Sequence, residues 1–144
     1  MIADTVDLAE TMLDMGRRAR AASRKLGQMT PADRTRGLQA VAAAIRASAS
    51  KVLAANAQDM DAAEAKGLDA AMLDRLALDA ARLEGIASSV EAVAGLPDPI
   101  GKELARWERP NGLDIARIAV PLGVIGIIYE SRPNVTADAG ALCL

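Results

Sequence analysis

The chain passes through Val120-Pro-Leu-Gly-Val-Ile-Gly-Ile-Ile-Tyr-Glu-Ser-Arg-Pro-Asn134, where an apolar run gives way to a polar loop and then to a helical pattern. Residues 118–129 are almost uninterrupted apolar sequence, rich in Ile and Val, which predicts a strand buried on both faces of a helix-covered sheet. Asn134 is a favoured N-cap and predicts a helix over residues 135–144. A strand, loop and helix in this order are how an open α/β sheet begins a binding crevice.

The glycines of this run do not form a nucleotide-binding motif. Gly123 and Gly126 are three residues apart and lie inside the predicted strand, whereas the dinucleotide fingerprint G-x-G-x-x-G lies in the turn after one. The chain also lacks the G-x-x-x-x-G-K-[ST] phosphate loop. We therefore interpret the two glycines as sites of close packing in preference to phosphate contact.

The composition excludes several classes of function. A net charge of −2 argues against a nucleic-acid partner, and no stretch approaches the about 20 apolar residues of a membrane span. The N-terminus lacks the apolar centre of a signal peptide, and a single cysteine suits a reducing cytoplasm. The absence of histidine excludes Ser-His-Asp and Cys-His catalysis within this chain, and we expect no metal site.

The N-terminal part reads as a series of alanine-rich helices. Residues 4–26 carry an apolar stripe at helical spacing, in which Met12 and Met15 are expected to fill the core. Five basic residues lie mostly off that stripe and predict a solvated face: Arg17, Arg18, Arg20, Arg24 and Lys25. Later helix boundaries are signalled by Thr30-Pro31, Gly67, Asp69 and Asp79, which predict helices from Thr30, over 50–66, over 70–76 and over 80–94.

Two polar features within these helices have structural interpretations. Asn56 lies near an apolar face, where an amide that holds backbone groups is commoner than a functional one. Asp74 and Arg75 predict a surface or inter-helix salt bridge.

The period changes after the Gly95–Pro99 segment, which ends the helices. Asn111-Gly112 between two extended segments predicts a β-hairpin, with arms over 102–108 and 113–120. Trp107 lies on its first arm, either as an anchor for a subunit contact or as a cap on the local core.

Several segments together resemble a known family. The chain is similar over nearly its whole length to the N-terminal part of the γ-glutamyl phosphate reductases, members of the aldehyde dehydrogenase superfamily. The matching pieces, in order, are Ala55-Asn-Ala-Gln-Asp59, Gly67-Leu68, Met72-Leu-Asp-Arg-Leu-Ala-Leu78, Leu96-Pro-Asp-Pro-Ile-Gly101 and Val120-Pro-Leu-Gly-Val-Ile-Gly-Ile-Ile-Tyr-Glu-Ser-Arg-Pro-Asn-Val-Thr136.

The resemblance implies an aldehyde-dehydrogenase-like α/β fold in three parts. Residues 1–99 would be the alanine-rich helical part of the cofactor-binding domain. Residues 100–119 would be a β-hairpin flap used in oligomerisation. Residues 120–144 would be the first strand, loop and helix of a Rossmann-like sheet that is incomplete in this chain.

The resemblance also implies an activity. The family uses NADPH to reduce L-glutamate 5-phosphate to L-glutamate 5-semialdehyde with release of phosphate, in proline biosynthesis. It implies a cytoplasmic homo-oligomer that acts on a small molecule, without nucleic acid or membrane, and a contact with the glutamate kinase that makes the substrate. The chain alone would be an inactive part.

Five residues of the loop are the candidate site. The resemblance implies that Asn134 assists the oxyanion, with a helix-cap role as the alternative, and that Arg132 attracts the anionic substrate. Glu130, Ser131 and Pro133 would lie near the nicotinamide. The loop departs from the Pro-Trp-Asn-Phe-Pro usual in the superfamily.

The same resemblance places the nucleophilic cysteine after residue 144. Cys143 is instead expected to be a small buried hydrophobic residue.

Two alternatives remain at this stage. One is a non-catalytic helical module that binds a partner through its alanine-rich helices. The other is a different aldehyde dehydrogenase relative, such as a CoA-acylating one, which the Tyr129–Asn134 loop disfavours.

Overall fold

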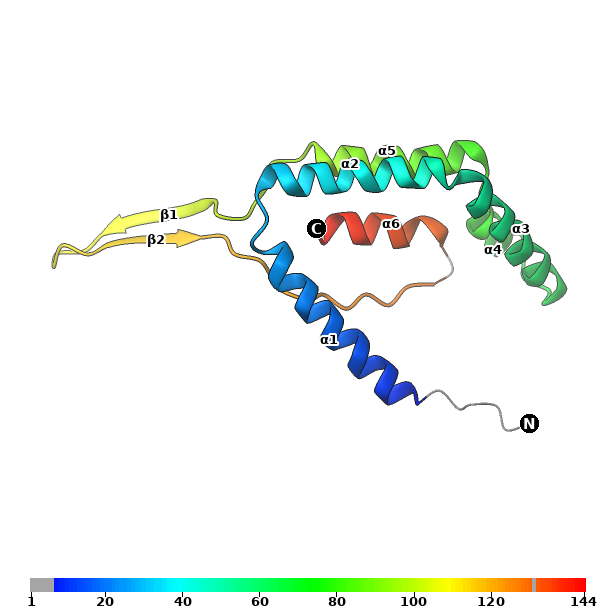
Figure 1. The fold of residues 1–144 in the computed structure, drawn as a ribbon, viewed down its shortest axis with the longest axis horizontal. Helices are drawn as coiled ribbons and strands as arrows, with labels where there is room; N and C mark the ends of the chain where they lie inside the picture. Colours follow the sequence, from blue (N-terminus) through cyan, green and yellow to red (C-terminus); the bar gives the residue numbers. More distant parts are fainter. Residues whose placement is uncertain (1–6, 131) are drawn as a thin grey trace. The chain divides into compact units, whose positions relative to one another are not determined.

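The computed structural model describes residues 7–130 and 132–144 and falls into two compact units (Figure 1). Of the described residues, one unit holds 7–29 together with 97–126. The other holds residues 30–96 and 127–144. Each unit is described by itself.

The second unit is built on two helices that lie side by side, α2 (Pro31–Ala47) and α5 (Ala80–Ala94), with α6 (Pro133–Leu142) packed against α5 (Figure 1). Small side chains at the contact let the helix backbones approach closely, so alanine forms much of the core. The buried cluster comprises Leu38, Ala42, Ala87, Val90, Ala94 and Ala141.

The predicted helix starts are confirmed by their capping hydrogen bonds. The Thr30 hydroxyl accepts from the Asp33 N–H at 3.2 Å and begins α2, with Pro31 in the first turn. Asp69 begins α4 (Ala70–Leu76) and Asp79 begins α5, each accepting an N–H from three residues on. Between them, α3 (Ala49–Ala65) ends just before Gly67, whose φ of +73° is the left-handed conformation expected after a helix.

The structural interpretation of Asn56 is confirmed. The residue is 6% exposed. Its amide donates to the Leu76 carbonyl at 2.9 Å and accepts from the Leu78 N–H at 2.8 Å. One side chain on α3 therefore holds both ends of the short connection between α4 and α5.

An inter-helix salt bridge forms at Asp74, as predicted, but its partner is Arg82 and not Arg75. The Arg82 guanidinium lies 2.7 Å from the Asp74 carboxylate and also donates to the carbonyl oxygens of Asp74 and Ala77. The bridge links α4 to α5.

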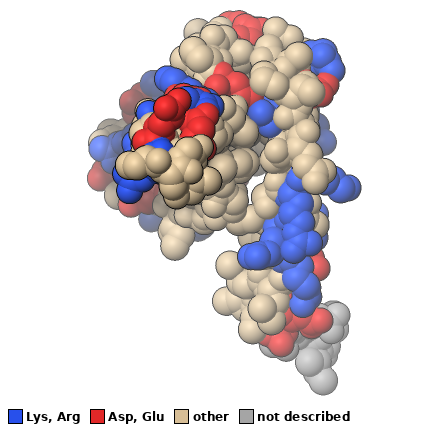
Figure 2. All heavy atoms as spheres, turned by 90° about the vertical axis from the view of Figure 1, so that its left-hand side faces the viewer, with Lys and Arg blue, Asp and Glu red and all other residues tan. Residues whose placement is uncertain are grey.

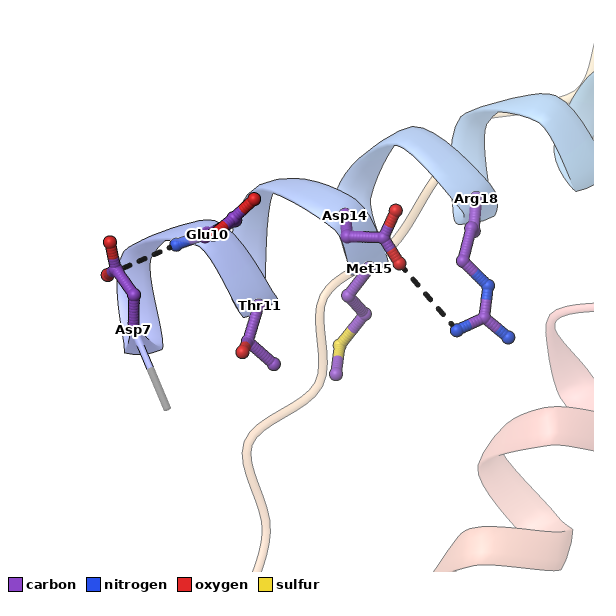
Figure 3. Close-up of a pocket in the computed structure, with 6 residues that line it drawn as sticks. All are labelled: Asp7, Glu10, Thr11, Asp14, Met15 and Arg18. Atoms are coloured by element: carbon purple, nitrogen blue, oxygen red, sulfur yellow. Dashed lines mark hydrogen bonds and ion pairs between the residues drawn. The ribbon is translucent and has the colours of Figure 1, made fainter. Parts of the chain in front are cut away.

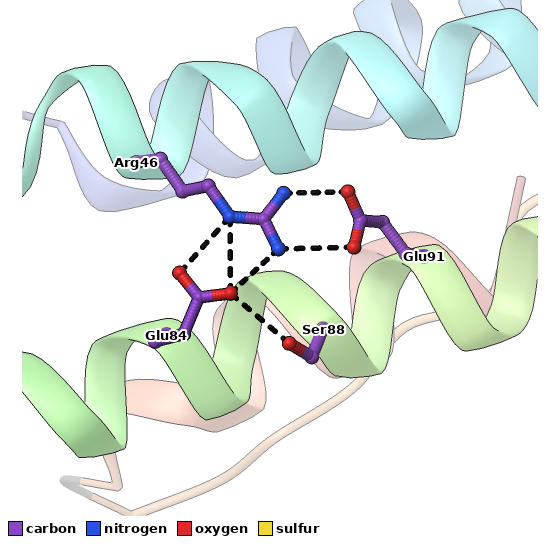
Figure 4. A network of polar contacts seen from close by, with 4 residues as sticks. All are labelled: Arg46, Glu84, Ser88 and Glu91. Carbon is purple, nitrogen blue, oxygen red and sulfur yellow. Dashed lines mark hydrogen bonds and ion pairs between the residues drawn. The ribbon is translucent and has the colours of Figure 1, made fainter.

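A second polar network joins α2 to α5 (Figure 4). The Arg46 guanidinium donates to Glu84 at 2.7 Å and to Glu91 at 2.9 Å, and Ser88 donates to Glu84 at 3.2 Å. The hydrogen bonds from Arg46 hold the pKa of Glu84 and the pKa of Glu91 below their ordinary value. Both carboxylates lie on one face of α5, so a single cation stabilises two negative charges.

This network predicts a specific pH dependence. Because the two pKa values are lowered in the folded state, the network stabilises the fold above the ordinary carboxyl pKa, and this contribution is lost as pH falls through the lowered values. Arg46→Gln should lower the thermal unfolding midpoint at neutral pH, with a difference from the parent chain that shrinks as the solution is acidified. The control Arg75→Gln should follow the parent chain throughout. A pH series of thermal unfolding by circular dichroism measures this, and a difference that stays constant with pH would contradict it.

In the first unit, α1 (Leu8–Leu26) confirms the predicted helix from Leu8 onward but buries no residue. The predicted residues 4–6 lie outside the described part of the chain. Met12 and Met15 are 55% and 57% exposed, so the expectation that they fill a core is wrong for this chain. The solvated basic face is confirmed at Arg17 and Arg18, which are exposed. Figure 2 shows acidic side chains near the start of α1 and basic ones further along the helix.

The predicted hairpin is confirmed. Strands β1 (Glu103–Glu108) and β2 (Asp114–Ile118) pair antiparallel, and Trp107 faces Ile115 across the ladder. The turn has three residues, Pro110, Asn111 and Gly112, one more than a two-residue Asn-Gly turn, because Arg109 pairs with Leu113. Gly112 is the last of the three and has a positive φ of +84°. Arg106 forms ion pairs with Glu103 and Asp114.

The predicted strand over residues 118–129 is wrong beyond Ile118. Residues 119–130 form no strand, and within the described part of the chain the sheet has only β1 and β2. Leu122 and Ile128 are fully or almost fully exposed, so the expected burial of this segment on both faces is also wrong. A strand exists only through hydrogen bonds to a neighbour. Ala119 still bonds to the backbone of Gly101 and Lys102, but no strand among the described residues pairs with residues 120–130.

Candidate functional site

The candidate site is the loop that enters α6, and its geometry begins with Pro133. Proline suits the first turn of a helix because its missing N–H would have no partner there. Arg132 is therefore the N-cap residue, in the extended conformation (φ −89°, ψ 112°) that a following proline favours. Asn134 lies one residue inside the helix, so the prediction that it caps α6 is wrong.

Hydrogen bonds hold the loop at both ends. The Tyr129 hydroxyl lies 2.5 Å from the Thr136 hydroxyl oxygen and so joins the segment before the loop to the first turns of α6. The Arg132 N–H donates to the Glu130 carbonyl at 2.8 Å. The entry to α6 is thus held by side-chain and backbone contacts.

Asn134 has a defined partner. Its side-chain amide donates to the Asp138 carboxylate at 2.8 Å, and both residues are half-buried. The two residues are four apart on a helix, so their side chains lie on one face, one turn from each other. An ionised carboxylate only accepts hydrogen bonds, so it requires the N–H₂ end of the amide to face it.

The remaining predicted site residues differ in their exposure. Glu130 and Arg132 are exposed, Pro133 is half-buried, and Ser131 lies outside the described residues. Arg132 makes no side-chain capping hydrogen bond to the helix that it precedes. The first residues of α6 therefore follow an exposed arginine and include a half-buried asparagine, at the positive end of the helix dipole, which favours an anionic group.

Cys143 does not occupy the buried position that was expected. It is exposed at the end of α6, because the buried face of that helix is occupied two residues earlier by Ala141. The exposure of Cys143 does not place it in the loop site.

Other features of the surface do not add to this site. A hollow on α1 is lined by six residues of the α1 segment alone, Asp7, Glu10, Thr11, Asp14, Met15 and Arg18, none of which was a predicted site residue (Figure 3). Among residues 7–130 and 132–144, no group of three or more acidic or cysteine side chains is arranged to hold a metal ion. None of the helices in the same residues is long and apolar enough to cross a membrane.

Solved structures with the same fold are known. A γ-glutamyl phosphate reductase from Thermotoga maritima superimposes with a TM-score of 0.88 at 37% identity, over 90% of this chain and 31% of the other. The Saccharomyces cerevisiae enzyme of that name gives 0.84 at 32% identity, over 90% of this chain and 33% of the other. No protein-family model matches.

Sequence relatives agree with the structures. A γ-glutamyl phosphate reductase of Hyphomonas neptunium is 79% identical over 137 residues, which is 95% of this chain and 32% of the relative. One from Paramagnetospirillum magneticum is 61% identical over 140 residues, 97% of this chain and 33% of the relative. The chain therefore spans about a third of the length of these relatives.

The fold is that of the N-terminal part of an aldehyde-dehydrogenase-like protein, with alanine-rich helices and a two-stranded hairpin. Within that class, the resemblance to the N-terminal part of γ-glutamyl phosphate reductase is confirmed.

The structure also shows contacts that sequence reasoning did not assign to the site. Tyr129, Thr136 and Asp138 hold the loop and the Asn134 amide. The four-residue spacing of Asn134 and Asp138 was a visible signal, because side chains at i and i+4 meet on a helix. The contact between Tyr129 and Thr136 had no comparable signal, because it depends on the path of the loop.

Proposed function

We propose that this chain provides one wall of the active site of a γ-glutamyl phosphate reductase. The reaction is the NADPH-dependent reduction of L-glutamate 5-phosphate to L-glutamate 5-semialdehyde, with release of phosphate, in proline biosynthesis. The observation that carries the proposal is the 79% identity to the Hyphomonas neptunium reductase across 137 residues. Because the chain spans about a third of that relative, the complete activity requires residues that this chain does not contain.

In this proposal the loop attracts the anionic substrate and stabilises the negative charge that develops during the reaction. The substrate carries a carboxylate and an acyl phosphate, and Arg132 attracts it as an exposed cation beside the helix N-terminus. One N–H of the Asn134 amide is bonded to Asp138, which leaves its second N–H to donate to the oxygen of the reacting carbonyl. A donor at that position stabilises the charge that develops when a nucleophile adds to the acyl carbon.

The covalent step uses a cysteine from outside this chain. Its thiolate adds to the acyl carbon and phosphate leaves, which gives a thioester. Hydride transfer to that carbon then releases the thiolate and the aldehyde. NADPH supplies the hydride when it is bound. The exposed Glu130 and the half-buried Pro133, with Ser131 between them in sequence, are the loop residues that we place beside its nicotinamide.

The remaining parts of the chain have proposed roles that follow the same resemblance. We place residues 1–99 in the cofactor-binding domain and residues 120–144 at the start of its Rossmann-like sheet. Residues 120–129 form no strand in this chain and would do so only beside a neighbouring strand from outside it. The hairpin over residues 100–119 is an oligomerisation flap, supported by the half-exposed Trp107 on a two-stranded sheet that needs a partner surface. We place the enzyme in the cytoplasm, in contact with the glutamate kinase that makes its acyl phosphate.

The proposal is tested by joining this chain to the remaining part of the Hyphomonas neptunium reductase. The resulting protein is called the chimera. It should restore growth without proline to a bacterial strain that lacks its own γ-glutamyl phosphate reductase. The Hyphomonas neptunium reductase itself is the positive control, and its remaining part without this chain is the negative control. A chimera that accumulates as folded protein but fails to restore growth would contradict the proposal and favour a non-catalytic helical module.

A further inference from the structure

We infer that Asp138 is a positioning residue, which fixes the orientation of the Asn134 amide for the reacting carbonyl. This inference rests on the proposed function. It concerns a residue that does not itself touch the substrate, and it starts from the hydrogen bond of 2.8 Å between the Asn134 N–H₂ group and the Asp138 carboxylate.

The hydrogen-bonding chemistry of Asn134 and Asp138 determines which end of the Asn134 amide faces the carboxylate. An asparagine amide can present either its N–H₂ end or its oxygen after a half-turn about its last bond, and only the N–H₂ end stabilises an oxyanion. The carboxylate of Asp138 accepts and cannot donate, so it selects the N–H₂ end on its own side. The second N–H of the same planar group then has a fixed direction, because the amide is planar.

The surroundings restrict the pair further. Both residues are half-buried on α6, which packs against α5 through Ala141. One turn of helix separates them, so the backbone sets the distance between the side chains. The hydroxyl contact between Tyr129 and Thr136 holds the loop that leads into this turn. The amide is thus held by a partner on a regular helix, which places a group more accurately than a loop does.

Positioning and direct electrostatics predict opposite results at Asp138. A carboxylate near the site disfavours both an anionic substrate and a developing oxyanion. If Asp138 acted only through its charge, Asp138→Asn would therefore raise the rate. If it positions Asn134, the same change lowers the rate, because an amide at 138 can also pair with the Asn134 oxygen and so permits the unproductive orientation.

The experiment is a double-mutant cycle in the chimera, read as kcat and KM separately. We expect Asp138→Asn to lower kcat about tenfold with little change in KM, and to have no further effect in the Asn134→Ala background. Asp138→Glu, which keeps an accepting carboxylate, should retain more activity than Asp138→Asn. Asp61→Asn, an exposed aspartate on α3, is the matched control for loss of a charge.

The outcomes separate this inference from the proposed function. An equal loss of kcat from Asp138→Asn with and without Asn134 would show a structural role and overturn the inference. An unchanged or raised kcat in Asp138→Asn would also overturn it. If the chimera is active but Asn134→Ala has no effect, the oxyanion role of Asn134 fails and the positioning role fails with it, while the family activity stands.

A second measurement needs no activity and uses the 144-residue chain itself. The two side-chain N–H resonances of Asn134 should show one proton shifted downfield and slow to exchange, because it is bonded to a carboxylate. Asp138→Asn should remove that signature, and Asp61→Asn should leave it intact. Equivalent behaviour of the Asn134 amide in all three chains would overturn the inference.

Discussion

Replacing Asn134 by alanine in the chimera is expected to lower kcat about a hundredfold, corresponding to about 3 kcal/mol of transition-state stabilisation. The reason is the loss of the amide N–H that is left after the bond to Asp138. KM should change little, because the charge that the amide stabilises develops during the reaction and is small in the bound substrate. Steady-state oxidation of NADPH at saturating and limiting acyl phosphate measures both constants.

The control for this prediction is the stability of the variant. Asn134 lies inside α6 and does not cap it, so alanine suits the position and the thermal unfolding midpoint should hold or rise slightly. Unchanged kcat and KM in a variant with parental stability would remove the oxyanion role. A rise in KM alone would show instead that Asn134 binds the substrate without favouring the transition state.

Asn56→Ala is expected to lower the free energy of unfolding of the chain by about 3 kcal/mol. The substitution leaves the Leu76 carbonyl and the Leu78 N–H without the partner that the buried amide supplies. It also releases the connection between α4 and α5, so the loss should be larger than for a single surface hydrogen bond. Denaturant unfolding followed by circular dichroism measures the difference.

Two comparison variants isolate the cause. Asn56→Asp keeps an acceptor for the Leu78 N–H but has no donor for the Leu76 carbonyl, so it should retain part of the stability at most. Gln58→Ala removes an amide from an exposed position on the same helix and should change the stability little. Equal effects of Asn56→Ala and Gln58→Ala would contradict the role assigned to Asn56.

Features set by neighbouring residues were predictable from the sequence. Asp69 and Asp79 begin helices because their side chains reach N–H groups only three residues away. Gly67 follows a helix because it alone adopts a positive φ without strain. Asn111 and Gly112 predicted the hairpin because these two residues favour the backbone conformation of a tight turn.

Features that depend on distant partners were not predictable. Residues 120–130 have the composition of a buried strand, yet they pair with no strand in the described part of the chain. Met12 and Met15 form an apolar stripe that no described side chain buries. Asn134 is not the N-cap of α6, as was predicted, because the helix begins at Pro133 and its N-cap is therefore Arg132.

The site itself was located by resemblance more than by pattern. The loop was found because it matches a family motif, while the contacts that organise it, from Tyr129 to Thr136 and from Asn134 to Asp138, became visible only in three dimensions. The roles of Arg132 and Asn134 remain predictions that the chimera tests.

We propose that this chain forms part of an enzyme that reduces an acyl phosphate. The most direct measurement is the ratio of phosphate released to NADPH oxidised by the purified chimera with L-glutamate 5-phosphate. We expect one phosphate for each NADPH, without any need for CoA. NADPH oxidation that requires CoA, or a folded chimera that oxidises no NADPH at all, would contradict it.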